Sequence, residues 1–145
     1  MIDAIPSQVL VHVLTTLGVA GGSTAWGIAY LKEPDGKGVN PQYVTIFDTL
    51  PDIQGYNHRD GEPIQHYTVQ IRIRSLVASV GHGMGRGILK ALNPSLYNNQ
   101  WIIMDTTPIL FHAFIVTQGL IQIGEDKSDR PIFTINGKFA LSPQE

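Results

Sequence analysis

Cysteine is absent from the 145-residue chain, which excludes disulfide bonds and thiolate metal sites. Charged residues are also scarce, at 15% of the sequence against about a quarter in ordinary soluble domains. A weakly charged surface repels its own copies weakly, which suits a chain that packs against neighbours, although a sparsely charged monomer shows the same composition. The net charge of −2 lacks the basic excess that dedicated nucleic-acid binders use.

Motifs for cofactor binding and catalysis are missing as well. The glycine-rich stretch Gly81–Gly87 lacks the third glycine of a dinucleotide fingerprint, and no phosphate-binding loop is present. The five histidines form no zinc-binding spacing. His112 lies in an apolar stretch and is interpreted as a satisfied core or interface residue. We therefore expect no catalytic site, no metal and no cofactor.

Long hydrophobic runs are limited to Val9–Ala20, which is too short for a membrane span and is interrupted by His12, Thr15 and Thr16. No basic segment precedes this run, as a signal peptide would require. We expect an amphipathic helix here, no membrane partner, and a soluble protein of the producing cell's cytoplasm.

Two helices are predicted, at Ile2–Leu17 and from a capping Ser75 to about Leu92. The second contains four glycines, each of which costs about 0.5–1 kcal/mol relative to alanine. These are Gly81, Gly83, Gly85 and Gly87. As two i,i+4 pairs they flatten two stripes of the helix, where another backbone could approach closely. A break into two short helices is the competing interpretation.

Strands are predicted by alternating or continuous apolar patterns between turn residues. They cover Trp26–Leu31, Tyr43–Asp48, Gln65–Arg74, Gln100–Met104, Ile109–Val116, Leu120–Ile123 and Ile132–Leu141. Pro108 and Gly119 separate some of them. One domain over residues 1–145 follows, of the α+β class, with a mixed, mostly antiparallel β-sheet and two main helices packed on one or both of its faces.

Candidate contact residues lie in three places. The polar segment Leu50–Pro63 has almost no apolar periodicity and is interpreted as an exposed arm. Strand 65–74 projects two arginines from its polar face, and a charged turn covers 125–130. The candidates for a subunit or tube interface are Asn57, His58, Arg59, Asp60, Arg72, Arg74, Asp126, Lys127, Asp129 and Arg130.

Two segments carry a resemblance to a known family. Strand YTVQIRIRS at Tyr67–Ser75 ends in basic residues and leads directly into a helix, and D-x-x-x-R-P-x-F-T-x-N matches Asp126–Asn136. In this order, over roughly Gln42–Phe139, the chain resembles the tail terminator (minor capsid) proteins of long-tailed bacteriophages. Its glycine-rich second helix departs from the alanine-rich helix of that family.

The resemblance implies a structural, non-enzymatic virion protein of the tail or neck, present in the host cytoplasm during assembly. Such proteins form a ring, typically a hexamer, on the completed tail tube, end its polymerisation and join tail to head. The implied partners are further copies of the chain, the tail tube protein and a head–tail connector protein. DNA passes through the lumen without specific recognition.

Three alternatives remain open at this point. The chain could be a head–tail connector or stopper of the neck, which would bind the portal side. It could be a small enzyme with a metal or acid–base site near residues 50–66, formed by His58, Asp60, Glu62 and His66, although a solvated loop explains that group better. It could also be a monomeric binding module.

Overall fold

The computed structural model describes residues 5–22, 24–35, 40–49, 65–104 and 106–143. This part of the chain forms two helices and seven strands. In chain order they are α1 (Pro6–Thr16), β1 (Gly27–Tyr30), β2 (Tyr43–Asp48), β3 (Gln65–Arg74), α2 (Ala78–Ala91), β4 (Gln100–Met104), β5 (Thr107–Phe111), β6 (Ile115–Glu125) and β7 (Pro131–Pro143).

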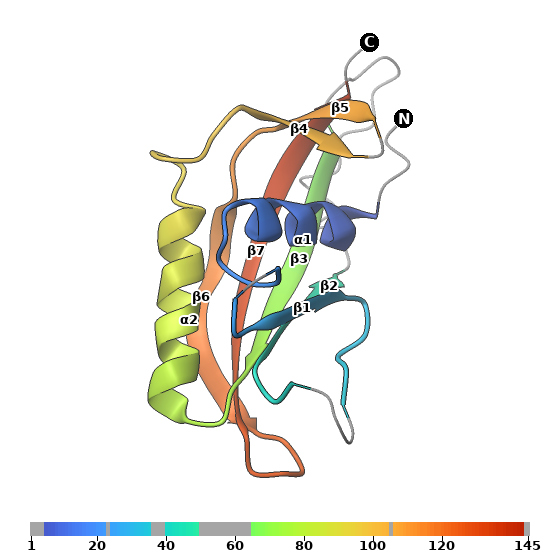
Figure 1. Cartoon of the computed structure of the whole chain (residues 1–145). Coiled ribbons are helices and arrows are strands. Elements are labelled where there is room, and N and C mark those ends of the chain that lie inside the picture. The colour runs from blue at the N-terminus through green and yellow to red at the C-terminus, as the bar shows by residue number, and fades with distance from the viewer. Residues whose placement is uncertain (1–4, 23, 36–39, 50–64, 105, 144–145) are drawn as a thin grey trace.

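The strands form one sheet in the order β1-β2-β3-β7-β5-β4, with β6 added beside β7 (Figure 1). Strands β1 and β2 are parallel, and all other pairs are antiparallel. The 13-residue β7 pairs with β3 on one side. On its other side it pairs first with β6 and then with β5. The predicted α+β class with a mixed, mostly antiparallel sheet is confirmed.

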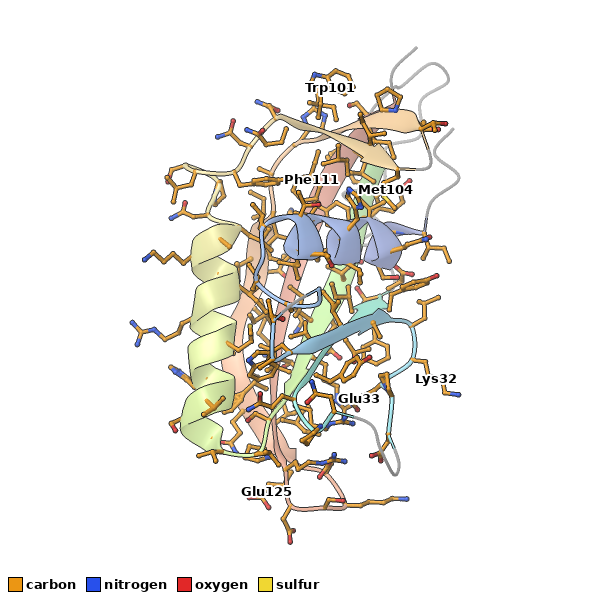
Figure 2. All side chains as sticks on the ribbon, viewed as in Figure 1. Lys32, Glu33, Trp101, Met104, Phe111 and Glu125 are labelled. Carbon is orange, nitrogen blue, oxygen red and sulfur yellow. The ribbon has the colours of Figure 1, made fainter. Side chains whose placement is uncertain are left out.

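One face of this sheet carries the core. Along β3 the apolar residues Val69, Ile71 and Ile73 are fully buried and alternate with polar residues on the opposite face. Both helices cover this apolar face, and their buried residues belong to one hydrophobic cluster with the strands. Figure 2 shows Phe111 and Met104 directed into this interior. Helix α1 crosses in front of β3 and β7, while α2 runs alongside β6 (Figure 1).

Helix α1 ends where the sequence indicates and begins within the predicted range. Pro6 occupies the first helical turn, where its missing amide is tolerated. The helix stops at Thr16, and Gly18 follows with a φ of +72°, a conformation that glycine adopts at low cost. The buried residues Val9 and Val13 lie on the predicted face. Residues 1–4 of the predicted helix lie outside the described residues.

Helix α2 is unbroken across its four glycines, so the interpretation of two short helices is wrong. The predicted cap is also wrong. Val77 precedes the first helical residue and makes no side-chain cap, whereas the Ser75 hydroxyl donates a hydrogen bond to the Val77 carbonyl at 2.7 Å. Ser75 is fully buried under Gly81, so its hydroxyl serves the entry into the helix rather than its first turn.

The glycines of α2 differ in what surrounds them. A Cβ on Gly85 would lie 2.4 Å from Leu120 of β6, and one on Gly81 would lie 2.5 Å from the Ser75 hydroxyl. A Cβ on Gly83 or Gly87 would meet no atom within 4 Å. The atoms that approach Gly81 and Gly85 thus belong to side chains rather than to the predicted backbone, and nothing among the described residues lies close to Gly83 or Gly87.

The predicted strand at 109–116 is wrong, because the chain leaves β5 after Phe111 and begins β6 at Ile115. Phe114, between them, places its ring against Gly137 of β7, and this contact turns the chain inward. Gly119 does not separate two strands but lies inside β6. Register shifts in the pairing of β6 with β7 accommodate it, as bulges do at sheet edges.

Candidate functional site

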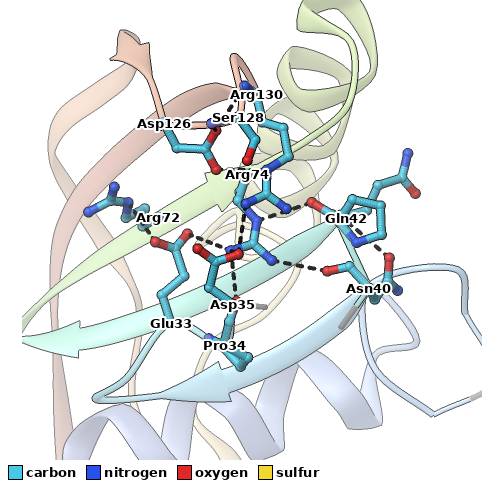
Figure 3. Close-up of polar contacts among 11 residues, drawn as sticks. Glu33, Pro34, Asp35, Asn40, Gln42, Arg72, Arg74, Asp126, Ser128 and Arg130 are labelled. Carbon is cyan, nitrogen blue, oxygen red and sulfur yellow. Dashed lines mark hydrogen bonds and ion pairs between the residues drawn. The ribbon is translucent and has the colours of Figure 1, made fainter. Parts of the chain in front are cut away.

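Four of the predicted interface residues lie together at one end of the sheet (Figure 3). Arg72 and Arg74 come from the polar face of β3, whereas Asp126 and Arg130 come from the turn between β6 and β7. Two carboxylates that follow β1, Glu33 and Asp35, connect them. We call these six residues the arginine–carboxylate cluster. It contains three arginines and three carboxylates, so its formal charges balance.

Arg74 is the centre of the cluster, and its side chain is only 1% exposed. Its guanidinium donates hydrogen bonds to three backbone carbonyls, those of Pro34 (2.7 Å), Asn40 (3.0 Å) and Pro41 (3.2 Å). It also lies 5.9 Å from the centre of the Tyr43 ring, within range of a cation–π interaction. These contacts hold the chain after β1 against the sheet, so Arg74 is occupied within its own subunit.

Arg130 joins the turn to the same segment. Its guanidinium donates to Asp35 at 2.9 Å and to Asp126 at 2.7 Å. Asp126 also accepts hydrogen bonds from the backbone amides of Ser128 and Arg130, both at 2.9 Å. Asp129 adopts a φ of +59°, which closes the turn. The motif that carries the family resemblance thus forms a turn that is closed by its own hydrogen bonds and by the ion pair between Asp126 and Arg130.

The pKa values in the cluster follow from these bonds. Partial burial acts to raise the pKa of Asp126, but the amides of Arg130 and Ser128 and the Arg130 guanidinium outweigh it and lower the pKa. The hydrogen bond to Asp35 is the largest cause that raises the pKa of Arg130, and Asp126 adds to it against the effect of burial. The turn is therefore held by ionised groups at neutral pH.

Arg72 is less tightly held, since its Nε lies 3.4 Å from a Glu33 oxygen without forming a hydrogen bond. Lys127 and Asp129, at the tip of the turn, are exposed and make no ion pair with a described residue. Of the candidates in the described ranges, these two are placed to contact another molecule. Asn57, His58, Arg59 and Asp60 lie outside the described residues.

Strand β6 contains the predicted strand Leu120–Ile123 but is much longer, since it runs from Ile115 to Glu125. Among the described strands it pairs with β7 alone, so its other edge is open. Four of its large apolar residues are 42–53% exposed, namely Ile115, Val116, Ile121 and Ile123. The ten residues from Ile115 to Gly124 contain no charged residue and no proline, and this composition is the signal that could have identified the strand.

A second exposed apolar site lies on β4, at the other end of the sheet. Trp101 and Ile103 are both more than half exposed. Figure 2 shows Trp101 directed away from the interior. Open strand edges with exposed apolar side chains are typical of surfaces that pair with another chain.

Two of the histidines considered in the sequence, His112 and His66, lie among the described residues. His112 lies between Asn99, 3.1 Å from its Nδ1, and Ser142, 2.6 Å from its Nε2. Both ring nitrogens therefore have partners, as predicted for a satisfied histidine. His66 is exposed on β3, while its predicted companions at 58, 60 and 62 are outside the described ranges. No group of three potential metal ligands occurs among the residues that the structure describes.

These observations define an α+β protein with an internally braced ionic cluster and open, apolar strand edges. Within the described ranges, no helix has the length and apolar character needed to cross a membrane. No protein-family model matches the chain, and no curated protein sequence matches it.

One solved structure, of a protein whose name states no function, aligns with 97% of this chain and 98% of its own. Its sequence identity is 10% and its TM-score is 0.46. At this level the similarity supports no conclusion about function.

Proposed function

We propose that this protein is a structural subunit of a phage tail, which assembles into a ring on the end of the tail tube and stops the tube from growing. The ring, a hexamer in the proteins that the sequence resembles, also provides the surface to which the head connector binds. The subunit works in the virion and is made in the host cytoplasm. No chemical reaction is part of this role.

The open edge of β6 is the observation that carries the proposal. Proteins that remain single usually protect an edge strand with charged residues or proline, because unpaired backbone groups invite another strand. Bulges interrupt β6, but its ten residues from Ile115 to Gly124 have neither form of protection. Four exposed apolar side chains add a hydrophobic contribution to any contact made there.

A ring follows if each subunit uses two different patches. A heterologous contact places one patch against another patch of the neighbour, and it closes when the rotation per subunit divides a full turn. Strand β6 lies on one side of β7, whereas β1, β2 and β3 lie on the other. The molecule therefore presents two dissimilar sides to its neighbours. To stop tube growth, one face of the ring must fit the last ring of the tube. The opposite face must not repeat the surface to which the next tube subunits would bind.

The experiment measures assembly by native mass spectrometry, with and without purified tail tubes. We expect the 15.9 kDa chain to form a closed ring, alone or on tube ends, and added ring to halt tube growth. The double variant Ile121→Lys/Ile123→Lys should prevent ring formation, because it places two charges on the open strand. Leu96→Lys is the matched control, since Leu96 is exposed outside any strand.

Two results would reject the assignment. A chain that stays monomeric in the presence of tube ends would not be a ring-forming subunit. A ring that binds portal particles rather than tubes in a pull-down experiment would instead be a connector or stopper. Deletion of residues 50–63, the predicted arm, should reduce ring formation; an unchanged native mass would show that this segment makes no subunit contact.

A further inference from the structure

The outer face of α2 carries a row of cationic and titratable side chains. His82, Arg86 and Lys90 are spaced four residues apart, so they lie on one face with a rise of about 6 Å between neighbours. All three are exposed, and none forms an ion pair with a described residue. We call these three residues the α2 row. Its two permanent cations, Arg86 and Lys90, can therefore pair with another molecule.

The fold of the subunit does not bring opposite charge to this row. Helix α2 contains no acidic residue, and the strands packed against it contain one, Glu125. Glu125 ends β6 next to the start of α2, where the Ser75 amide donates a hydrogen bond to the Pro131 carbonyl at 3.2 Å. Arg86 and Lys90 lie about 12 and 18 Å along the axis from the first residue of the helix. This separation explains why no ion pair joins them to Glu125.

Most carboxylates in the described part of the chain are engaged within the subunit. Three pair with arginines and a fourth accepts hydrogen bonds at the start of α1; they are Glu33, Asp35, Asp126 and Asp48. The other two described carboxylates, those of Glu125 and Asp129, are exposed and form no ion pair with a described residue. Both belong to the turn between β6 and β7.

This turn presents a small acidic surface. Asp126 and Arg130 neutralise each other in the turn. The exposed residues Glu125, Lys127 and Asp129 then carry a net charge of −1, and we call these three residues the turn tip. Figure 1 shows the turn at the end of the sheet, beside the first residues of α2. The tip is thus placed to reach past its own subunit.

The turn tip and the α2 row are different patches, so a contact between them is heterologous and can close into a ring. We propose that the turn tip of one copy docks on the α2 row of the neighbouring copy. Glu125 and Asp129 are the charge partners of Arg86 and Lys90. This inference rests on the proposed function, and it names the residues on both sides of one contact between subunits.

The charges set the orientation of this contact. Exposed ion pairs are individually weak, so they contribute more to specificity and to the rate of association than to affinity. Apolar surface beside the tip adds stability, because Leu76 and Val77, which precede α2, are both more than half exposed. On the other side of the contact, a Cβ on Gly83 or Gly87 would meet no atom within 4 Å, so a neighbour can approach the helix closely.

The α2 row also adjoins the strand edge that the proposed function assigns to subunit contact. His82 borders a hollow of about 370 Å³ that is lined on the other side by Gln122 of β6. Docking of the turn tip on the row would therefore bring the neighbouring copy close to the open edge of β6. The charged and the apolar parts of this side can contribute to the same interface.

Nucleic acid fits the α2 row less well. Two permanent charges per subunit fall short of the roughly six to ten phosphate contacts that are typical of a DNA-binding protein. The net charge of the whole chain is also negative. The two carboxylates of the turn tip match the two cations of the row.

The test is a charge exchange in the full-length chain, with ring formation measured by native mass spectrometry. Arg86→Gln/Lys90→Glu changes the charge of the row from +2 to −1, with His82 neutral, and Glu125→Lys/Asp129→Asn changes that of the tip from −1 to +2. Asparagine is chosen because position 129 has a φ of +59°, which asparagine tolerates. Each double variant alone should raise the subunit concentration needed for half-maximal ring formation by about tenfold or more. The quadruple variant restores opposite charges at an unchanged net charge and should recover assembly.

Lys127→Glu is a variant that should assemble better than the wild type. Lys127 is the cation of the turn tip, and its replacement makes the tip more acidic, with a net charge of −3. The concentration needed for half-maximal ring formation should fall by about two- to fivefold. Lys32→Glu is the matched control, because it makes the same charge change on an exposed residue after β1, on the other side of the sheet from β6, and should leave this concentration unchanged.

Circular dichroism spectra and melting temperatures of the monomers check that each variant folds. Rings that persist unchanged in both double variants would overturn this inference and leave the proposed function intact. Loss of assembly in both without recovery in the quadruple variant, or a Lys127→Glu variant that assembles no better than the wild type, would also overturn it. So would binding of a duplex DNA probe that requires Arg86 and Lys90. A wild-type chain that forms no ring on tube ends would reject the proposed function as well.

Discussion

The glycines of α2 and β7 differ in whether a methyl group would fit beside them. Gly83 and Gly87 have nothing near a Cβ, and neither has a positive φ that would strain a side chain. Gly137 of β7 lies under the ring of Phe114, where a Cβ would come within 2.2 Å of the ring edge. Alanine should therefore stabilise the exposed helix positions and destabilise the buried strand position.

The magnitudes follow from backbone entropy and packing. Each Gly→Ala change in an exposed helix interior contributes about 0.5–1 kcal/mol, so Gly83→Ala/Gly87→Ala should add about 1–2 kcal/mol to the free energy of unfolding. Gly137→Ala forces the Phe114 ring to move within a packed core, which costs about 1–3 kcal/mol. For a chain of this size, 1 kcal/mol shifts the melting temperature by about 2–4 °C.

Urea denaturation followed by circular dichroism measures both changes, with the midpoint read at constant slope. We expect the midpoint to rise for Gly83→Ala/Gly87→Ala and to fall for Gly137→Ala. Both variants add methyl groups to glycines, so each is a control for the other. A lower midpoint for the helix variant would show that its glycines pack against something, and would refute the assignment of that stripe to solvent.

Two further predictions concern the arginine–carboxylate cluster. Arg74→Leu leaves backbone carbonyls and Glu33 without their buried cation, and should lower the free energy of unfolding, measured by urea denaturation, by about 3–5 kcal/mol. Arg72→Leu loses one partly exposed ion pair and should lower it by less than about 1 kcal/mol. Equal losses in the two variants would contradict the central role of Arg74. The folded-state pKa of Asp126 is lowered, so its contribution to stability is present above the usual value of 3.8 and is lost as the pH falls through the folded pKa. Asp126→Asn should thus lower the melting temperature at pH 7, and this effect should shrink as the pH falls below 3.8; an effect that stays constant across this range would contradict the linkage.

Local patterns in the sequence were sufficient to predict the elements whose environment is simple. Strands β2 and β3 begin and end at the predicted residues, because each is bounded by turn residues, and alternation along β3 marks its buried face. Helix α1 stops as predicted because glycine follows it. The α+β class follows from the order of these elements, and the composition of residues 125–130 was enough to predict the charged turn.

Prediction from sequence failed where distant contacts override local preference. Gly119 normally marks a strand end, yet β6 continues through it because its partner β7 is long and supplies hydrogen bonds on both sides of the bulge. Ser75 is a favourable cap residue, but its burial beneath Gly81 directs the hydroxyl elsewhere. The open edge of β6 could not be predicted either, since apolar composition alone does not tell a buried strand from an exposed one.

The residues of the candidate site show the same division. The sequence by itself determined that Arg72 and Arg74 share the polar face of a strand, because side chains two residues apart always point the same way. Only the tertiary structure decided that Arg74 is buried and braces its own chain, whereas Lys127 and Asp129 face outward. Burial depends on which segments fold over a residue. The segment that covers Arg74 follows β1 and includes Pro34, which is 40 positions away in the sequence. No local pattern encodes that contact.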